Sequence, residues 1–320
     1  MNIVYTSDDN YADIMGVSIA SLLEANKAID KINFYIINDG ISKNNLDKLS
    51  ELIAKYSRSV FYVTAPRIDD CVDVKTDRTN LSLTAFQRLF LPTMLSKDIG
   101  KILYLDCDTL IVDNLRSLYE TNIDDCLAAG VLDPISIHEK SRVNLSADDS
   151  YFNSGVILFN LARMRKYNVE QIFLDYIRRH KGIIVHSDQG IINGTINNQI
   201  KVLSPRYNSL AFHFLYPYQT IKTLRNPAVY YSENEYKESV TNPAIIHFHG
   251  GIMNLRPWVN NSVHPYKSRW NNVKKMSPWK DTPPHSDDRS IILKLLVLAF
   301  KLLPPTLAAT VGSFANRIRA

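Results

Sequence analysis

Two aspartates one residue apart, Asp106 and Asp108, stand directly after the apolar segment KILYL. Carboxylates at this spacing can both reach one divalent cation if the backbone turns at the end of the strand. Oxygen atoms are the ligands that Mg²⁺ or Mn²⁺ prefers. A solvated pair of carboxylates is the plainer interpretation, because the D-x-D pattern is short and common. The position after a long apolar strand favours a metal site.

The segment DCDTL (106–110) also fits a different chemistry. It matches the D-x-D-x-T pattern of haloacid-dehalogenase-like phosphatases, in which the first aspartate is a covalent nucleophile and the second an acid or base. Those enzymes usually carry the motif on the first strand of the fold, whereas three strand-like segments precede it here. The late acidic pair of such phosphatases is also not seen. The phosphatase is therefore the weaker interpretation.

Two further segments can serve a metal or a nucleotide. In SDDNY (7–11), Asp8 and Asn10 can read a base by side-chain hydrogen bonds, although an Asx-rich turn that caps a helix explains them equally well. In HFHGG (247–251), His247 can be a metal ligand, and Gly250 leaves room for a phosphate to approach the backbone. A lone histidine is more often structural, so both interpretations stay open.

The segment SDQGIIN (187–193) can begin a helix. Asp188 and Gln189 would then lie in its first turn, where their side chains can face a ligand. The alternative is that Ser187 is an ordinary N-cap and the segment has no chemical role.

The elements around these residues alternate between strand and helix. Apolar runs predict strands at 2–7, 32–39, 59–65 and 101–106, and in the second half at 126–133, 154–161 and 244–250. Helical spacing of apolar residues is seen over 11–26 and 169–180, and Ser42 is a good N-cap for another helix. Such alternation predicts βαβ units and a mostly parallel sheet. Ligands bind such sheets beyond the carboxyl ends of the strands, where the acidic segments stand.

Composition limits the function. The apolar fraction is 45% and the charged fraction 22%, which indicates a folded core. Three cysteines, Cys71, Cys107 and Cys126, show neither metal-site spacing nor a disulfide framework. The N-terminus, MNIVYTSDDN, lacks the basic and apolar regions of a signal peptide. We therefore expect a cytoplasmic protein.

The positive charge is concentrated at the C-terminal end. Lys and Arg outnumber Asp and Glu by 37 to 32, and five basic residues account for that excess: Arg289, Lys294, Lys301, Arg317 and Arg319. No basic stripe crosses the rest of the chain, so a nucleic-acid partner is not expected. We expect an α/β domain at 1–276, a linker at 277–288 and a basic, apolar tail at 289–320.

The tail includes IILKLLVLAFKLL (291–303), which is apolar apart from two lysines. As a helix it spans only about 20 Å, too short to cross a bilayer. A helix packed on the domain is one interpretation. A helix lying on an anionic membrane surface is favoured, because the apolar surface is broad and the charge wholly basic. The chain is then peripheral, on the inner face of the cell membrane.

Six segments occur together in this order: SDDNY, LSLTAFQRLFLP, KILYLDCDTLIV, YFNSGVILFNL, SDQGIIN, and HFHG followed by RPW. With them the chain resembles family 8 glycosyltransferases, the group of glycogenin and of bacterial lipopolysaccharide and lipooligosaccharide galactosyl- and glucosyltransferases. The resemblance implies a Rossmann-like GT-A fold, a UDP-hexose donor carrying galactose or glucose, Mn²⁺ or Mg²⁺, and retention of anomeric configuration. The implied acceptor is a glycan, glycolipid or glycoprotein in surface polysaccharide synthesis. A non-catalytic sugar-nucleotide-binding module is a further alternative.

The resemblance also implies roles for individual residues. Asp106, Asp108 and His247 would bind the metal, and Asp188 and Gln189 would be the catalytic pair, with Gln189 beneath the anomeric carbon. The nucleotide sugar would contact the following residues: Thr6, Asp8, Asn10, Arg88, Asp106, Cys107, Asp133, Asn153, Asp188, Gly250 and Arg256.

Three positions depart from the family pattern. Five residues separate Gly250 from Arg256, where the family commonly has two. Gly190 replaces the second acid of the family's D-Q-D, and Asn80 replaces a histidine that contacts phosphate in related galactosyltransferases. With no acid at position 190, we expect the acceptor to attack from the face that UDP leaves.

Overall fold

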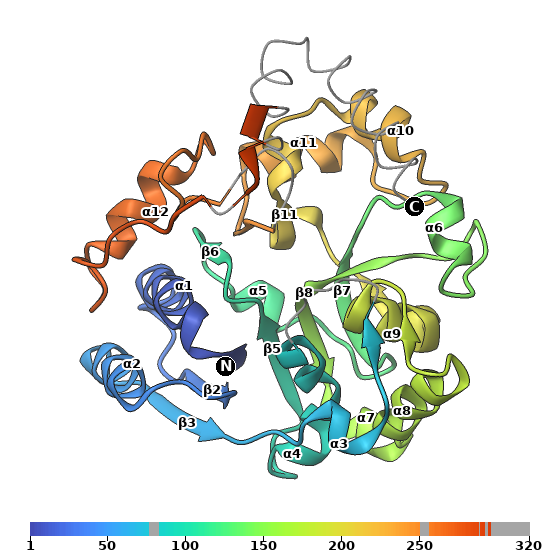
Figure 1. Ribbon diagram of the computed structural model, residues 1–320, viewed down its shortest axis with the longest axis horizontal. Helices are drawn as coiled ribbons and strands as arrows, with labels where there is room; N and C mark the ends of the chain where they lie inside the picture. The colour runs from blue at the N-terminus through green and yellow to red at the C-terminus, as the bar shows by residue number, and fades with distance from the viewer. Residues whose placement is uncertain (77–82, 250–255, 288, 292–293, 296–320) are drawn as a thin grey trace.

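The computed structural model describes residues 1–76, 83–249, 256–287, 289–291 and 294–295. Within these residues, a seven-stranded sheet runs through the middle of the molecule (Figure 1). Its strands in spatial order are β10 (Ile200–Val202), β7 (Ala128–Leu132), β8 (Phe152–Asn160), β5 (Lys101–Leu105), β1 (Asn2–Ser7), β2 (Asn33–Asn38) and β3 (Ser59–Val63). Neighbours pair in parallel, except that β8 is antiparallel to β5 and β7. The mostly parallel sheet predicted from the sequence is confirmed.

Helices flank the sheet on both sides. Figure 1 shows α1, α2 and α12 on one side and α7, α8 and α9 on the other, with β5 and β8 between them. The α-helices of the described residues are α1 (Ala12–Ala25), α2 (Lys43–Lys55), α3 (Ile68–Cys71), α4 (Leu91–Met94), α5 (Arg116–Tyr119), α6 (Ile137–Ser141), α7 (Leu161–Lys166), α8 (Val169–Arg179), α9 (Ser187–Ile196), α10 (Tyr218–Arg225), α11 (Glu233–Thr241) and α12 (Lys267–Lys274). Short 3₁₀ helices are η1 (Asp9–Tyr11), η2 (Leu83–Phe90), η3 (Asn197–Gln199), η4 (Pro205–Asn208) and η5 (Ala211–Phe214).

A second, smaller sheet brings the C-terminal half to the end of β5. It consists of β11 (Ser209–Leu210), β12 (Ile245–His247) and β6 (Thr109–Ile111). β12 is parallel to β11 and antiparallel to β6. A further short pair joins β4 (Lys75–Thr76) and β9 (Ile183–Ile184). The second-half strand expected over 244–250 therefore ends at His247.

In the first half of the chain, the apolar patterns and the capping residue predicted the observed strands and helix start. β5 is buried after its first residue and β8 is buried through Phe159, as apolar strands covered on both faces should be. The Ser42 hydroxyl accepts a hydrogen bond from the Asn45 amide and caps α2, as predicted.

Residues 277–287, most of the expected linker, pack on α1 and α2. The Trp279 side chain is buried, and its indole Nε1 donates to Asn45 Oδ1 at 3.0 Å. Its ring lies so close to α1 that a Cβ on Gly16 would be 2.2 Å from it. His285 Nε2 is 2.9 Å from Asp13 Oδ2. The domain boundary at 276 stays a prediction, and residues 296–320 of the tail lie outside the described residues.

Among the helices that the structure describes, none combines the length and apolar character needed to cross a bilayer.

Candidate active site

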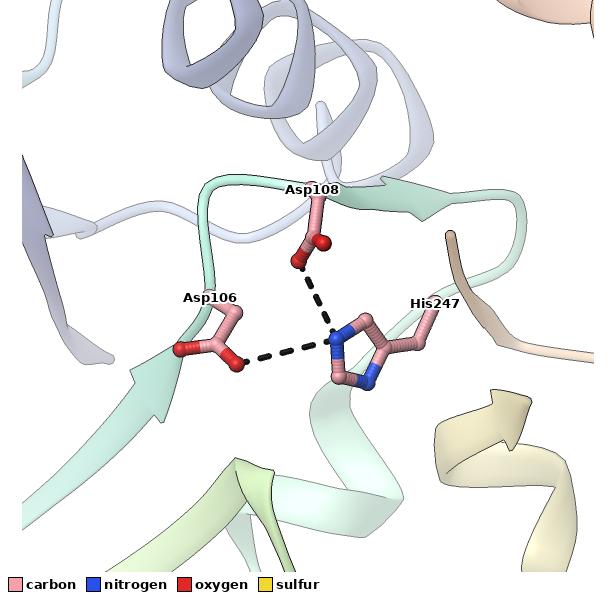
Figure 2. Close-up of side chains that lie close together, drawn as sticks. All are labelled: Asp106, Asp108 and His247. Carbon is pink, nitrogen blue, oxygen red and sulfur yellow. Dashed lines mark ion pairs between the residues drawn. The ribbon is translucent and has the colours of Figure 1, made fainter. Parts of the chain in front are cut away.

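Asp106, Asp108 and His247 form a compact cluster beyond the carboxyl end of β5 (Figure 2). One potential ligand atom from each residue lies within 4.8 Å of the others. His247 Nε2 is 3.0 Å from Asp108 Oδ1 and 3.6 Å from Asp106 Oδ2. Two carboxylates and one imidazole are a suitable donor set for Mn²⁺ or Mg²⁺. The fold thus brings together the three residues expected to bind metal.

Strand register explains how residues far apart in sequence meet here. In the antiparallel pair of β6 and β12, Thr109 faces His247, so the imidazole arrives beside Asp108. The Phe248 amide donates to the Asp108 carbonyl at 2.8 Å. On the other side, the Asp106 amide donates to the Gly155 carbonyl at 2.8 Å, which continues the pairing of β5 with β8.

Hydrogen bonds behind the cluster orient the imidazole. His247 Nδ1 is 3.0 Å from Asn208 Oδ1, and Asn208 Nδ2 donates to Asn153 Oδ1 at 2.8 Å. Because the Asn208 amide nitrogen is used as a donor, its oxygen accepts the Nδ1 proton of His247. Nε2 is therefore the nitrogen that faces the two carboxylates, and it can ligate a metal ion once it has lost its proton.

The electrostatics of the cluster also fit a cation. Burial alone would lower the pKa of His247, but Asp108 and Asp106 raise it above the usual value. Burial alone would raise the pKa of Asp108, but His247 lowers it, and the charge of Arg256 lowers it further. Without a metal ion, a proton on His247 offsets the carboxylate charge. A divalent cation at this position would replace that proton.

Gly155 leaves the space that the cluster occupies. A Cβ at this position would be 2.2 Å from His247 Cε1 and 2.7 Å from Asp106 Oδ2. Atoms do not approach this closely without displacement, so any side chain at position 155 would displace His247 and Asp106.

Arg88 links the cluster to α9. Its guanidinium donates to Asp106 Oδ1 at 2.9 Å and to the Ser154 carbonyl at 2.7 Å, and its Nε is 3.3 Å from Asp188 Oδ2. Its charge lies 4.0 Å from the centre of the Tyr104 ring, and the Tyr104 hydroxyl also donates to Asp106 Oδ1. One oxygen of Asp106 is therefore held by Arg88 and Tyr104, which leaves Oδ2 facing His247.

Asp188 and Gln189 lie in the first turn of α9, as expected. Burial raises the pKa of Asp188, and the nearby charge of Arg88 opposes that rise. The Ser154 amide donates to Gln189 Oε1 at 3.1 Å, and Gln189 Nε2 donates to Asp133 Oδ2 at 3.3 Å. Asn153 Nδ2 donates to the same carboxylate oxygen at 3.0 Å. Continuous hydrogen bonds thus join Gln189 to His247.

The expected uridine residues follow β1. The Asp8 carboxylate accepts the Tyr11 amide and caps η1, so the helix-capping interpretation is confirmed, while Asn10 is exposed. The Cys107 thiol donates to the Thr6 carbonyl at 3.2 Å. The Thr6 hydroxyl is buried and has no hydrogen-bond partner among the described residues. A role for these residues in nucleotide binding stays a prediction.

The expected diphosphate residues are placed only in part. The Arg256 guanidinium lies 5.8 Å from the centre of the Trp258 ring, and its Nε has no hydrogen-bond partner in the part of the chain that the structure describes. Its effect on the pKa of Asp108, which is secondary to burial and to His247, puts its charge near the cluster. Gly250, like Asn80, lies outside the described residues.

Sequence patterns did not identify Gly155, Asn208 or Tyr104 as part of the site. The signal for Gly155 was available, because a glycine inside an apolar strand often marks a close approach of another group. Asn208 has no such signal, since it ends η4 and meets His247 only through the tertiary fold.

Known proteins resemble this chain over most of its length. General stress protein A of Bacillus subtilis (strain 168) is 26% identical over 282 residues, which are 87% of this chain and 94% of that protein. Lipopolysaccharide 1,2-glucosyltransferase of Escherichia coli (strain K12) is 27% identical over 297 residues, 91% of this chain and 82% of that protein.

A solved structure shares the fold. The galactosyltransferase LgtC, crystallised with donor and acceptor sugar analogues, superposes with a TM-score of 0.72 at 22% identity, over 87% of this chain and 96% of LgtC. The central sheet and its flanking helices are thus those of the GT-A fold. The sequence profile described as glycosyl transferase family 8 matches residues 2–262. The matched range includes Asp106, Asp108 and His247. By this match the chain belongs to glycosyltransferase family 8.

Proposed function

We propose that this protein transfers a hexose, galactose or glucose, from a UDP-sugar to a glycan or lipid-linked acceptor in surface polysaccharide synthesis, with retention of anomeric configuration. The observation that carries the proposal is the Asp106, Asp108 and His247 cluster, joined by hydrogen bonds to Gln189. Family membership supports it, as do relatives that are lipopolysaccharide glucosyl- and galactosyltransferases. Neither the phosphatase nor the binding module has support from the comparisons.

The cluster would hold Mn²⁺ or Mg²⁺ through Asp106, Asp108 and His247. The chemistry that such a cation supplies when bound is neutralisation of the charge that develops on the departing diphosphate. Arg256 would add a positive charge on the same side, with Gly250 against the diphosphate. Thr6, Asp8, Asn10 and Cys107 would hold the uridine.

The hexose would lie over the hydrogen-bonded residues between the metal cluster and the start of α9. Arg88, Asp133, Asn153 and Asp188 would line the pocket, with the Gln189 amide beneath the anomeric carbon. A sugar that becomes cationic in the transition state is stabilised by nearby amide and carboxylate oxygens. Gln189 Oε1 accepts from the Ser154 amide and Gln189 Nε2 donates to Asp133, so this side chain is held in one orientation.

The geometry around Gly190 supports attack from the face that UDP leaves. A Cβ at this position would lie 1.8 Å from the Val185 carbonyl oxygen, so an aspartate has no room in this backbone. A double displacement needs a nucleophile close to the anomeric carbon on the opposite face. Gln189 is a poor nucleophile, and Asp188 is paired with Arg88. The acceptor proton would pass to the departing phosphate oxygen.

The test is a panel of UDP-sugars, scored for metal-dependent UDP release and for the anomeric configuration of the product by NMR. UDP release with a retained anomer supports the proposal. An inverted anomer, or a sugar adduct on Gln189 or Asp188 in intact-protein mass spectrometry, would contradict the mechanism. Phosphate release from sugar phosphates would instead identify a phosphatase, and binding without turnover a binding module.

Mutation of the cluster tests the metal assignment. Asp106→Asn or Asp108→Asn should each lower turnover by at least about 100-fold, because each removes a charged ligand of the ion that stabilises the leaving group. Steady-state turnover with Mn²⁺ or Mg²⁺ is the measurement. Activity close to that of the parent in both variants would show that the metal lies elsewhere.

We also propose that the protein is cytoplasmic and binds the inner face of the cell membrane through residues 289–320. The support is the sequence itself, because these residues carry all of the net positive charge beside a broad apolar segment.

A further inference from the structure

The turn that leads into α9 has an unusual backbone. His186 and Ser187 both have positive φ angles, 58° and 56°. Two consecutive non-glycine residues in the left-handed region cost conformational energy and persist only where the surrounding structure holds them. The next two residues are Asp188 and Gln189. The strain therefore lies directly before the residues that face the proposed sugar pocket.

The His186 ring is held at both nitrogens. Nδ1 is 2.8 Å from the Tyr151 hydroxyl, and Nε2 is 2.8 Å from Glu139 Oε2. The Glu139 carboxylate can only accept, so Nε2 carries a proton and donates it there. In that tautomer Nδ1 accepts a hydrogen bond from the Tyr151 hydroxyl. The His186 and Tyr151 rings also pack edge to face, with centroids 5.8 Å apart. Both hydrogen bonds fix the ring, and through it the backbone of the turn.

The partners of His186 are themselves fixed. Glu139 lies in α6, which Ser136 caps, and it also pairs with Arg142 at 2.9 Å. The buried Lys140 amine donates to the Ala147 carbonyl at 2.8 Å and holds the following loop. A small apolar cluster of Ile135, Val143, Leu145 and Tyr151 packs beneath this loop, with Val185 against it. α6 and its loop thus form a rigid support on which the turn rests.

The support reaches Gln189 by two routes. The Gly190 amide donates to the His186 carbonyl at 3.1 Å, so the turn sets the start of α9. The Gln189 side chain also lies near the Tyr151 hydroxyl, where it opposes the rise that burial causes in the pKa of Tyr151. We propose that His186 is a positioning residue, whose ring, held between Glu139 and Tyr151, fixes the strained turn that orients the Gln189 amide. Its role rests on the proposed function, because Gln189 is the residue that it positions.

Comparison of His186→Gly with His186→Ala distinguishes a role of His186 in positioning Gln189 from a role in stabilising the fold. Both remove the ring, but glycine adopts the left-handed conformation freely and alanine does not. His186→Gly should therefore melt within about 4 °C of the parent, since relief of strain offsets the lost hydrogen bonds, whereas His186→Ala should melt lower. Turnover should fall in both by a similar factor of roughly 10 to 100, as for a misplaced group, with donor KM changed less than about threefold.

Two variants serve as controls. Lys181→Gly relieves the same kind of strain at an exposed residue with φ 52° and should keep the parent's turnover. Glu139→Gln keeps an oxygen that can accept the Nε2 proton and should retain more turnover than Glu139→Ala. The inference would be overturned if the loss of turnover ran parallel to the loss of melting temperature, so that His186→Gly had a turnover close to that of the parent. His186 would then be a purely structural residue.

Combination with Gln189→Ala distinguishes this inference from the proposed function. Gln189→Ala alone should be slowed by roughly 10- to 1,000-fold, as expected for lost electrostatic support. If His186 acts through Gln189, adding His186→Gly to that variant should cause little further loss, because the two effects are coupled. Independent, multiplying losses would overturn the positioning role alone. A Gln189→Ala variant with the parent's turnover would overturn the proposed role of Gln189 and the positioning role with it.

Discussion

Gly155 shows how closely the residues of the site depend on one another. Its missing side chain is the space in which the His247 ring and the Asp106 carboxylate meet. Gly155→Ala should destabilise the fold by about 1–3 kcal/mol, as overpacking does. It should also weaken divalent-metal binding by roughly 10- to 100-fold, because the ligands are displaced. Calorimetric titration with Mn²⁺ and thermal unfolding measure the two effects.

Gly100→Ala is the matched control. A Cβ at position 100 meets only the Ala162 Cβ, at 3.9 Å, which is an ordinary contact. This variant should bind Mn²⁺ like the parent. Equal metal affinity in the two glycine variants would mean that the cluster does not bind the ion.

His247 gives the metal-free protein a pH-dependent stability. Burial alone would lower its pKa, but Asp108 and Asp106 raise it. A raised folded pKa means that the protonated ring stabilises the fold fully below the unfolded value of about 6.5, and that this contribution is lost as the pH rises through the folded pKa. For Asp108, whose pKa His247 lowers against the effect of burial, the contribution is lost as the pH falls through the folded pKa.

The measurement is the free energy of unfolding of parent and His247→Gln without metal, between pH 5 and pH 9. The difference between the two should shrink as the pH rises above about 6.5. Affinity for Mn²⁺ should increase over the same range, since the metal ion competes with the proton. A difference that does not change with pH would contradict the assigned ion pair.

At the scale of single residues, the sequence predicted which residues form the cluster but not which neighbours hold them in place. Asp106 and Asp108 follow a strand whose apolar pattern is unmistakable, so their place at the sheet edge could be foreseen. Asn208 contacts the cluster through tertiary packing, which leaves no local pattern. Tyr104 lies two residues before Asp106, within an apolar run in which nothing marks its hydroxyl as part of the site. The left-handed turn at His186 and Ser187 also has no signal, because glycine, the residue that usually marks such a turn, is absent there.

At the scale of elements, α1 and the segment after α12 are joined by Trp279. Trp279→Ala should cost about 3–5 kcal/mol of unfolding free energy, as removal of a buried tryptophan does. Gly16→Ala alone should also destabilise, because its Cβ would lie 2.2 Å from the indole ring. In the Trp279→Ala variant the same change should cost almost nothing. Chemical denaturation of the four proteins measures this coupling, and additive costs would exclude the contact.

The helices and strands predicted most securely were those with a long stretch of regularly spaced apolar residues. β1 and α1 follow such patterns closely, and the cap at Ser42 is a local signal that the fold preserves. The packing of residues 277–287 was not foreseen, because Pro, Ser and Asp are typical of linkers. A single tryptophan and one histidine to aspartate contact outweigh that composition.

At the scale of the whole molecule, the C-terminal residues divide into a packed and a basic part. A chain that ends at Asp288 keeps the Trp279 and His285 contacts, so it should fold and retain activity on a soluble acceptor. It should lose affinity for anionic vesicles, because the basic residues that follow are removed. Co-sedimentation with phosphatidylglycerol vesicles and thermal unfolding are the measurements.

A chain that ends at Met276 is the comparison. It lacks both contacts and should unfold at a lower temperature than the chain that ends at Asp288. Vesicle binding that survives removal of the residues after Asp288 would show that the tail is not the membrane-binding part.

The pairing of β6 with β12 also has a consequence for how the protein is made. The two carboxylates leave the ribosome first, and His247 follows about 140 residues later, which takes roughly 7–28 s at synthesis rates of about 5–20 residues/s. Until β12 is translated and inserts beside β6, the nascent chain has only the two carboxylates of the proposed cation site. Binding of an ion by all three residues would therefore require that translation has passed β12. A fragment released by a stalled ribosome before that point would lack the bound ion that protects a folded chain from proteolysis.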